Sequence, residues 1–217
     1  MDTPNLPVHS ELPGWNLFWV RLETVPEPEK PLAALREAVA ERARSAWTLE
    51  DLPDRPAVAA MRKLFRAAGC DPTRYRPSSE ALLRRVLKGE SLPAIHPLVD
   101  LNNCLSVALA LPCCIVAEGS FSPPVTLRAG LPGESYESLR GPFNLEGKPL
   151  LADSQGPFGT PITDSQRVKV TDGTRRAWLG AYLPSGVVTP EAVRRELEAL
   201  LAEAPVAKIE TPEVSTT

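Results

Sequence analysis

Cysteine and histidine provide most catalytic nucleophiles, bases and metal ligands in proteins, and this sequence holds few of them. The four cysteines are Cys70, Cys104, Cys113 and Cys114. No two of these cysteines have the C-x-x-C spacing of a zinc or redox site, so we expect buried free thiols. His9 lies in a proline-rich segment and His96 precedes a proline, so neither is placed to activate a nucleophile. The residue types therefore argue against a His-based triad, and we expect no metal site.

Acidic and basic side chains are the other candidates for chemistry. Acidic residues such as Asp153 and Asp164 could serve as an acid–base pair, although nothing in their spacing brings them together. The densest positive stretch spans residues 74–88. Its basic residues are Arg74, Arg76, Arg84, Arg85 and Lys88. Arg84 and Lys88 are one helical turn apart and could contact successive phosphates of a nucleic acid, or could simply form a solvated helix face.

The overall charge does not favour a strongly basic nucleic-acid-binding protein. The chain has 217 residues and a formal net charge of −3, with 43% hydrophobic and 24% charged residues. Any RNA would therefore have to bind through the local basic stretch, and we expect no binding to DNA or to membranes. No apolar run approaches the length that spans a bilayer, and the first residues lack the parts of a signal peptide. We therefore expect a cytoplasmic protein.

Hydrophobic periodicity predicts mainly helices in the first half of the chain and mainly strands in the second. The expected helices cover residues 31–48, 56–68, 78–88, 97–110 and 190–203. The expected strands cover residues 15–25 and the short runs CCIVAE, VTLRA, PLLAD and RAWLGAYL after residue 112. The 24 prolines favour short elements separated by many turns.

These elements predict an α/β (α+β) fold in which helices flank a mixed β-sheet. No stretch has the composition of a flexible linker, so we expect one compact domain over residues 15–204. Residues 1–14 are expected to form an irregular arm, and the polar residues 205–217 are expected to form a flexible tail.

Several longer strings occur in an order that resembles a known family. They are YRPSSEALLRRVLKGESLPAIHPLVDLNN at residues 75–103, LPCCIVAE at 111–118, LRAGLPGESYESLRG at 127–141 and LLADSQGPFGTPITDSQRVKVTDGT at 150–174. Together they resemble the free-standing B3/B4 domain proteins, which are similar to the editing module of the bacterial phenylalanyl-tRNA synthetase beta subunit. The resemblance covers residues 75–183, whereas the first 70 residues match only in character.

The resemblance implies a B3/B4-like editing-domain fold with a pocket between two subdomains. It also implies a trans-acting aminoacyl-tRNA deacylase that hydrolyses the ester of a mischarged tRNA. The reaction would need no metal, other cofactor or covalent nucleophile, because the ribose hydroxyl of the substrate can shuttle the proton. The implied partners are an aminoacylated tRNA and its amino-acid moiety. The alternatives are a non-catalytic module that binds an amino acid or tRNA, and a hydrolase of small esters or amides.

The candidate residues of the implied pocket come from the helix at 97–110, the following strands and the loop at 160–165. They are Asp100, Asn103, Cys114, Thr160, Asp164, Ser165 and Gly180. Asp100 and Asn103 share one helix surface and could hold the amino acid or a water molecule, or could satisfy nearby backbone groups. Asp164 and Ser165 could bring polar groups into the pocket, or could lie in a polar loop where Asp164 pairs with Arg167.

Two departures from the family pattern concern this pocket. A histidine of the synthetase module falls on Cys114, and a glutamate of its last pocket strand falls on Gly180. Their absence favours the non-catalytic alternative and argues against a substrate charged with tyrosine, the amino acid that the synthetase module removes. The expected role of Cys114 is to line the pocket, because it has no basic neighbour to activate its thiol.

Overall fold

A run of helices in the first half of the chain is followed by a run of short strands in the computed structural model, which describes residues 7–25, 32–210 and 214–215. The helices are α1 (Leu32–Ala46), α2 (Pro56–Ala67), α3 (Ser78–Leu87), α4 (Pro97–Leu109) and α5 (Pro190–Glu203), with 3-10 turns η1 (Leu52–Asp54) and η2 (Gln166–Val168). The strands are β1 (Val8–Ser10), β2 (Trp15–Thr24), β3 (Cys113–Ala117), β4 (Val125–Ala129), β5 (Ser135–Ser138), β6 (Gly141–Asn144), β7 (Pro149–Asp153), β8 (Gly156–Gly159), β9 (Arg176–Pro184), β10 (Ala207–Ile209) and β11 (Val214–Ser215). The predicted α+β class is confirmed, and each predicted helix is found within two residues of its expected ends.

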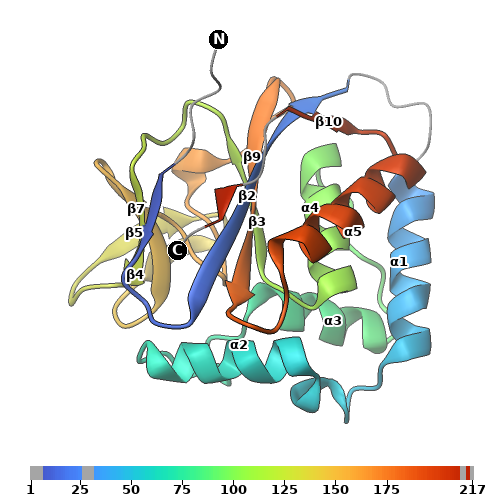
Figure 1. Cartoon of the computed structure of the whole chain (residues 1–217), viewed down its shortest axis with the longest axis horizontal. Helices are drawn as coiled ribbons and strands as arrows, with labels where there is room; N and C mark the ends of the chain where they lie inside the picture. Colours follow the sequence, from blue (N-terminus) through green and yellow to red (C-terminus); the bar gives the residue numbers. More distant parts are fainter. Residues whose placement is uncertain (1–6, 26–31, 211–213, 216–217) are drawn as a thin grey trace.

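The central sheet has the strand order β10-β2-β9-β3, and β11 also pairs with β2 (Figure 1). Its pairings are antiparallel, and β9 lies between β2 and β3. Residues 177–184 of β9 are all buried, because other elements cover both faces of this strand. A sheet that is covered on both sides can therefore hold polar groups away from solvent.

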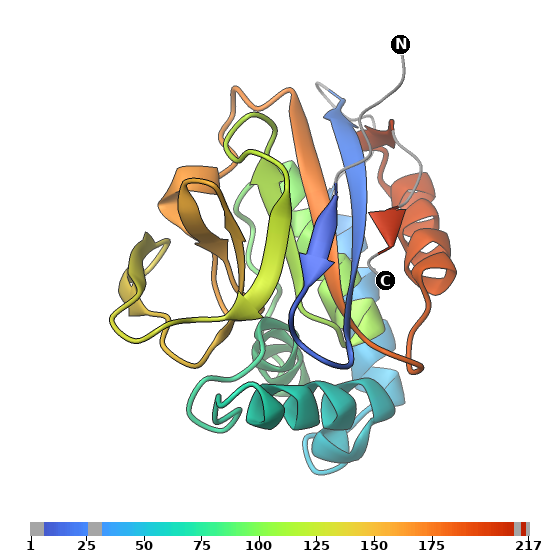
Figure 2. The same ribbon diagram turned by 60° about the vertical axis from the view of Figure 1, so that its left-hand side comes forward.

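A second sheet, with the order β1-β4-β7-β8, lies on one side of the central sheet. The hairpin of β5 and β6 stands at the outer end of this part of the molecule (Figure 2). An aromatic column joins the two sheets: Trp19 of β2 stacks on Phe121, and Phe121 stacks on Phe158 of β8. The ring centroids are 6.0 and 5.1 Å apart, so these side chains fill the space between the sheets.

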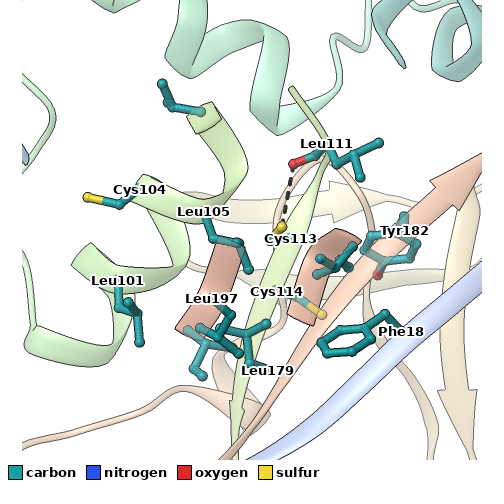
Figure 3. Packing of buried hydrophobic residues seen from close by; sticks show 14 of the residues in the cluster. Phe18, Leu101, Cys104, Leu105, Leu111, Cys113, Cys114, Leu179, Tyr182 and Leu197 are labelled. Carbon is teal, nitrogen blue, oxygen red and sulfur yellow. Dashed lines mark hydrogen bonds between the residues drawn. The ribbon is translucent and has the colours of Figure 1, made fainter. Parts of the chain in front are cut away.

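Helices α1, α4 and α5 cover the other side of the central sheet, and α2 and α3 lie across one end of the molecule (Figure 1). Figure 3 shows part of the core under these helices, where Leu105 of α4, Leu197 of α5 and Leu179 of β9 belong to one buried cluster. The buried Cys113 thiol donates a 3.5 Å hydrogen bond to the carbonyl of Leu111. Helix α4 is buried along most of its length because it lies between the sheet and other helices.

Three segments near the chain ends form strands that the sequence analysis did not predict. Strand β1 lies within the expected irregular arm and pairs in parallel with β4. Strands β10 and β11 lie within the expected flexible tail, and both pair with β2. These pairings depend on tertiary position rather than on a local apolar pattern. Residues 1–6, 31, 211–213 and 216–217 of the expected arm, first helix and tail lie outside the described residues.

Three further strands, β5, β6 and β8, were not predicted either. Strand β5 (SYES) is mostly polar, and β6 (GPFN) and β8 (GPFG) each begin with glycine and proline, so no apolar run marks them. These strands lie before and after β7 along the chain. They matter for the site because they hold the segment that follows Gly159.

Candidate active site

The face of the central sheet that is turned toward the second sheet carries a small cluster of mostly polar side chains, which we call the polar group. Trp19 of β2, Gly180 of β9 and Cys114 of β3 are register partners and therefore lie on one face. Tyr182 is two residues beyond Gly180 and shares that face. Trp19 and Tyr182 are completely buried, and Cys114 is 1% exposed. The polar atoms of these side chains are thus held away from bulk solvent.

Asp164 reaches this group from the segment between β8 and η2. Its backbone pairs with Gly159, and its carbonyl accepts the N–H of Leu139 at 3.2 Å. Oδ1 of Asp164 lies 3.0 Å from the position that a Cβ atom on Gly159 would occupy. The hydroxyl of Tyr182 lies 3.7 Å from the same position. The carboxyl and phenol groups therefore converge on one point beside Gly159.

The Asp164 carboxyl is buried without a cationic partner. Part of the residue is exposed, but its Oδ1 atom is buried and has no hydrogen-bond partner among the described residues. None of the ion pairs within that part of the chain involves Asp164. Burial raises the pKa of this carboxyl to about 7, opposed by a backbone hydrogen bond from Thr160. At neutral pH the group is therefore poised between its charged and neutral forms.

Two hydroxyl groups hold the loop that carries Asp164. The Thr160 hydroxyl and the Tyr136 hydroxyl each donate to the carbonyl of Thr163 at 2.6 Å. The two hydroxyl oxygens are 3.4 Å apart. Burial, and then the charge of Asp164, raise the pKa of the Tyr136 phenol. Both groups therefore remain neutral donors, and they fix the position of the loop beside β5.

The Cys114 thiol is a space-filling group in this site rather than a nucleophile. Burial raises its pKa well above the usual value, and the charge of Asp164 adds to that effect. The packing around it is close: a Cβ atom on Gly180 would lie 2.9 Å from Cys114 Sγ and 3.0 Å from two ring carbons of Trp19. A longer side chain at position 180 therefore has no room in this packing.

Gly180→Ala is expected to lower the free energy of unfolding by about 1 to 3 kcal/mol, because its methyl group would overlap Cys114 Sγ and the Trp19 ring. A lower urea midpoint with an unchanged m value would show the loss. Cys114→Ala removes one of the two obstacles, so the double variant should lose less than the sum of the single losses. Strictly additive losses would contradict a direct contact.

The polar group contains four of the candidate pocket residues. They are Cys114, Thr160, Asp164 and Gly180. Ser165 follows directly, but its hydroxyl accepts the N–H of Arg167 and so caps η2. The alternative in which Asp164 pairs with Arg167 is wrong. Arg167 pairs instead with Asp153, whose carboxylate both Nη atoms contact at 3.0 and 3.1 Å.

Asp100 and Asn103 of α4 are not part of the polar group. The Asp100 carboxylate forms an ion pair with Arg36 and accepts the backbone N–H of Ile95 at 2.9 Å. Of the two roles predicted for Asp100, these contacts correspond to the structural role, in which the side chain satisfies backbone groups near the start of the helix. Asn103 is partly buried, and it is Asn102 that contacts β3, through a 3.5 Å hydrogen bond to the Cys113 carbonyl.

Two residues of the polar group, Tyr136 and Tyr182, were missed by the sequence analysis. Tyr182 could have been found, because it is two residues after Gly180 in a predicted strand and must share its face. Tyr136 carries no such signal. It lies in β5, which was not predicted, and only the pairing of β5 with β6 turns it toward Thr160.

Among the predicted tRNA-binding residues, Arg76 and Arg84 share one acidic partner. Both form ion pairs with the buried carboxylate of Glu80 in the first turn of α3. The backbone N–H of Ser78, in the same turn, donates to the carbonyl of Pro161 at 2.9 Å. The start of α3 is therefore in direct contact with the loop that precedes Asp164.

The other basic candidates have different surroundings. Arg85 is paired with Glu90 at 3.1 Å. The guanidinium of Arg74 lies 5.1 Å from the centre of the Tyr75 ring. Lys88 is exposed at the C-terminal end of α3. The basic stretch thus includes both paired and solvent-facing charges.

Two surface hollows, of about 500 and 650 Å³, lie elsewhere. The first is lined by Leu87 and residues of the segment 44–50, and the second mainly by residues 171–176 and 117–118. Within the described ranges, no group of three or more His, Cys, Asp and Glu side chains could hold a metal ion. No helix in the same ranges combines the length and apolar character needed to cross a bilayer.

The fold and the polar group define an α+β domain with a buried, unpaired carboxyl between two sheets. The model of the B3/4 domain family matches residues 60–201, and the chain belongs to this family. A comparison with curated proteins finds no match. Among solved structures, the chain is similar to an N-terminal fragment of the phenylalanyl-tRNA synthetase beta-subunit from Pyrococcus horikoshii, with 15% identity and a TM-score of 0.49. The match covers 99% of this chain and 55% of that chain, so this chain spans about half of the fragment.

Proposed function

We propose that this protein is a trans-acting deacylase that hydrolyses the ester bond of mischarged aminoacyl-tRNA. The observation that carries the proposal is the Asp164 carboxyl, which is buried beside Thr160 without a cation to neutralise it. The α-ammonium group of an amino acid would supply the positive charge that this site lacks. Every aminoacyl-tRNA carries such a group next to its ester.

Membership of the B3/4 domain family supports a tRNA-related role. The strings at residues 75–103 and 150–174, which resemble the editing module, contain all of the basic stretch except Arg74, and the Asp164 loop, respectively. The hydrogen bond from Ser78 to Pro161 joins these two segments directly. An RNA end held at the basic stretch would therefore lie next to the loop that carries Asp164.

In the proposed reaction, one water molecule adds to the carbonyl carbon of the ester. The bond between that carbon and the ribose oxygen then breaks. The free amino acid keeps the OH of the water, and the ribose oxygen receives the remaining proton through the neighbouring ribose hydroxyl. Asp164 holds the α-ammonium group and so fixes the carbonyl carbon. Because the ester is already activated, positioning supplies much of the rate.

Asp164→Asn is expected to reduce the rate of deacylation at least about 100-fold, because the amide cannot balance the charge of a desolvated ammonium group. The measurement is the loss of ester over time, at low salt, from a panel of tRNAs charged with different correct and incorrect amino acids. Asp172→Asn is the matched control, since it makes the same change at an exposed turn.

Rapid release of one or a few amino acids, lost in Asp164→Asn and kept in Asp172→Asn, would support the proposal. It fails if the wild-type protein leaves the whole panel intact at high enzyme concentration. It also fails if the two variants release the amino acid at the same rate, since Asp164 would then not hold the substrate.

One observation favours a second candidate function, a module that binds an amino acid or tRNA without hydrolysis. Gly180 and Cys114 stand where the editing module has a glutamate and a histidine, and the Trp19 ring leaves no space at position 180. Thermal unfolding with added amino acids and with uncharged tRNA separates the two candidates. A ligand that raises the melting temperature while every ester stays intact would support the binding module.

A further inference from the structure

A buried carboxylate, Glu80, gathers three arginine side chains beside the proposed site. Its side chain is 1% exposed and lies in the first turn of α3. Arg62 of α2, Arg76 of the connection before α3, and Arg84 of α3 form ion pairs with it at 3.2, 3.5 and 2.9 Å. We call these four residues the Glu80 cluster. One negative charge among three positive charges leaves the cluster strongly cationic.

The arginines of the cluster all contact Glu80 through their Nε atoms. Only Arg84 donates a hydrogen bond to Glu80, at 2.9 Å, whereas the Nε atoms of Arg62 and Arg76 lie within ion-pair distance of the carboxylate without a hydrogen bond. Within the described residues, no hydrogen bond involves the Nη atoms of these three arginines. The side chains of Arg76 and Arg84 are 39% and 28% exposed, so these residues reach the surface. The two Nη groups of a guanidinium form the fork that matches two oxygens of a phosphate. The Nη groups of the cluster are therefore available to bind a second anion.

Another buried carboxylate of this protein, that of Asp153, is neutralised by a single arginine. The side chain of Asp153 is fully buried, and Arg167 holds it with both Nη atoms. Glu80 instead forms ion pairs with arginines from three segments, each through the Nε atom of the arginine. Guanidinium groups held this close repel one another, and that repulsion is relieved when an additional anion binds. The excess charge is therefore not explained by the stabilisation of Glu80.

We propose that the Glu80 cluster binds a phosphodiester group of an RNA backbone, with Glu80 as the residue that positions the three arginines. The choice of RNA as the source of the phosphate rests on the proposed function. Its location supports that choice, because the contact between Ser78 and Pro161 places the first turn of α3 against the Asp164 loop. The bound phosphate would then belong to the acceptor end of the tRNA.

The test uses an uncharged RNA hairpin with an acceptor stem and a single-stranded CCA end, labelled for fluorescence anisotropy. Arg62→Gln and Arg84→Gln should each weaken binding by about tenfold at moderate salt. Each should also lower the slope of log affinity against log salt by about 1, the value for one lost phosphate contact. Arg84→Lys keeps the charge but lacks the planar fork, so it should restore binding only in part.

Arg195→Gln on α5 removes the same charge from an exposed position and should leave the affinity within about twofold. Thermal melting confirms that each variant is folded. The proposal is overturned if Arg84→Gln and Arg195→Gln weaken binding equally, if Arg84→Lys restores it fully, or if the wild-type protein does not bind the hairpin. Stabilisation by inorganic phosphate without hairpin binding also overturns it, because the ligand would then be a small anion. Since the hairpin carries no amino acid, a failure of deacylation leaves this test unaffected.

Discussion

The free energy of unfolding of Asp164→Asn will increasingly exceed that of the wild-type protein as the pH rises, by up to about 4 kcal/mol between about pH 4 and pH 8. Burial raises the pKa of the Asp164 carboxyl from 3.8 to about 7. The folded protein therefore keeps this proton up to about pH 7, whereas the unfolded chain releases it near pH 4. The stability of the wild-type protein falls over this interval, and the loss is complete above the folded pKa.

Asparagine has nearly the same shape as aspartate and no charge to desolvate, so the variant lacks this loss. Urea unfolding of both proteins at several pH values measures the difference in the free energy of unfolding. Asp172→Asn, which makes the same change at an exposed turn, serves as the control. A difference between Asp164→Asn and the wild-type protein that stays constant from pH 4 to pH 8 would contradict the burial of a titrating carboxyl.

The same substitution is expected to remove deacylation, so one variant should be both more stable and less active. Proteins tolerate such a stability cost mainly at functional sites, where a buried and unpaired group is kept for its interaction with a ligand. A variant that is more stable and fully active would instead make Asp164 a structural residue.

Arg167→Met will lose about 3 to 5 kcal/mol of stability, because it leaves a buried carboxylate without its partner. The side chain of Asp153 is fully buried and is held by both Nη atoms of Arg167. Although burial opposes it, hydrogen bonds from Arg167 and from two backbone N–H groups hold the pKa of Asp153 below its usual value. Arg167 also donates to the carbonyls of Ser120 and Gly156 at 3.2 Å. The substitution therefore loosens the segment that leads to Asp164.

Chemical unfolding measures this loss, and Arg194→Met provides a matched control. Arg194 is paired with Glu198 one turn along α5, and that carboxylate is 52% exposed. A surface pair of this kind contributes less than about 1 kcal/mol, so the control should remain close to the wild-type protein. Adding Asp153→Asn to Arg167→Met should recover part of the loss, because the stranded charge is then removed. Equal losses in the two arginine variants would show that Asp153 is not buried as a charged group.

The helices could be located from the sequence because their signals are local. The helix at 190–203 begins after Thr189, whose hydroxyl accepts the N–H of Ala192, and repeats its apolar residues at helical spacing. Strands β2, β3, β4, β7 and β9 were predictable for the same reason, since each contains an apolar run. Strands β1 and β10 have no such run, and they exist only because β4 and β2 offer them backbone partners.

The candidate site was predictable in its positions but not in its contacts. Family-like strings pointed to Thr160, Asp164, Cys114 and Gly180, which the structure brings together. No sequence signal indicated that Arg167 would bind Asp153 and leave Asp164 without a cation, because Asp153 and Asp164 are equally acidic and Asp164, not Asp153, is the nearer of the two to Arg167 along the chain. The role of Glu80 was likewise hidden, since Arg62 comes from a separate helix.

The amino-acid sequence alone determined the α+β class, the five helices, the family and the two segments that form the proposed site. It could do so because periodicity, capping and ordered motifs are properties of neighbouring residues. The tertiary structure decided which charges are neutralised. It buries Asp164 without a cationic partner among the described residues, it satisfies Asp153 and Asp100 with arginines, and it surrounds Glu80 with three. Ion pairing and desolvation depend on distances between residues that are far apart in the chain, and only the packing of the two sheets and the helices sets those distances.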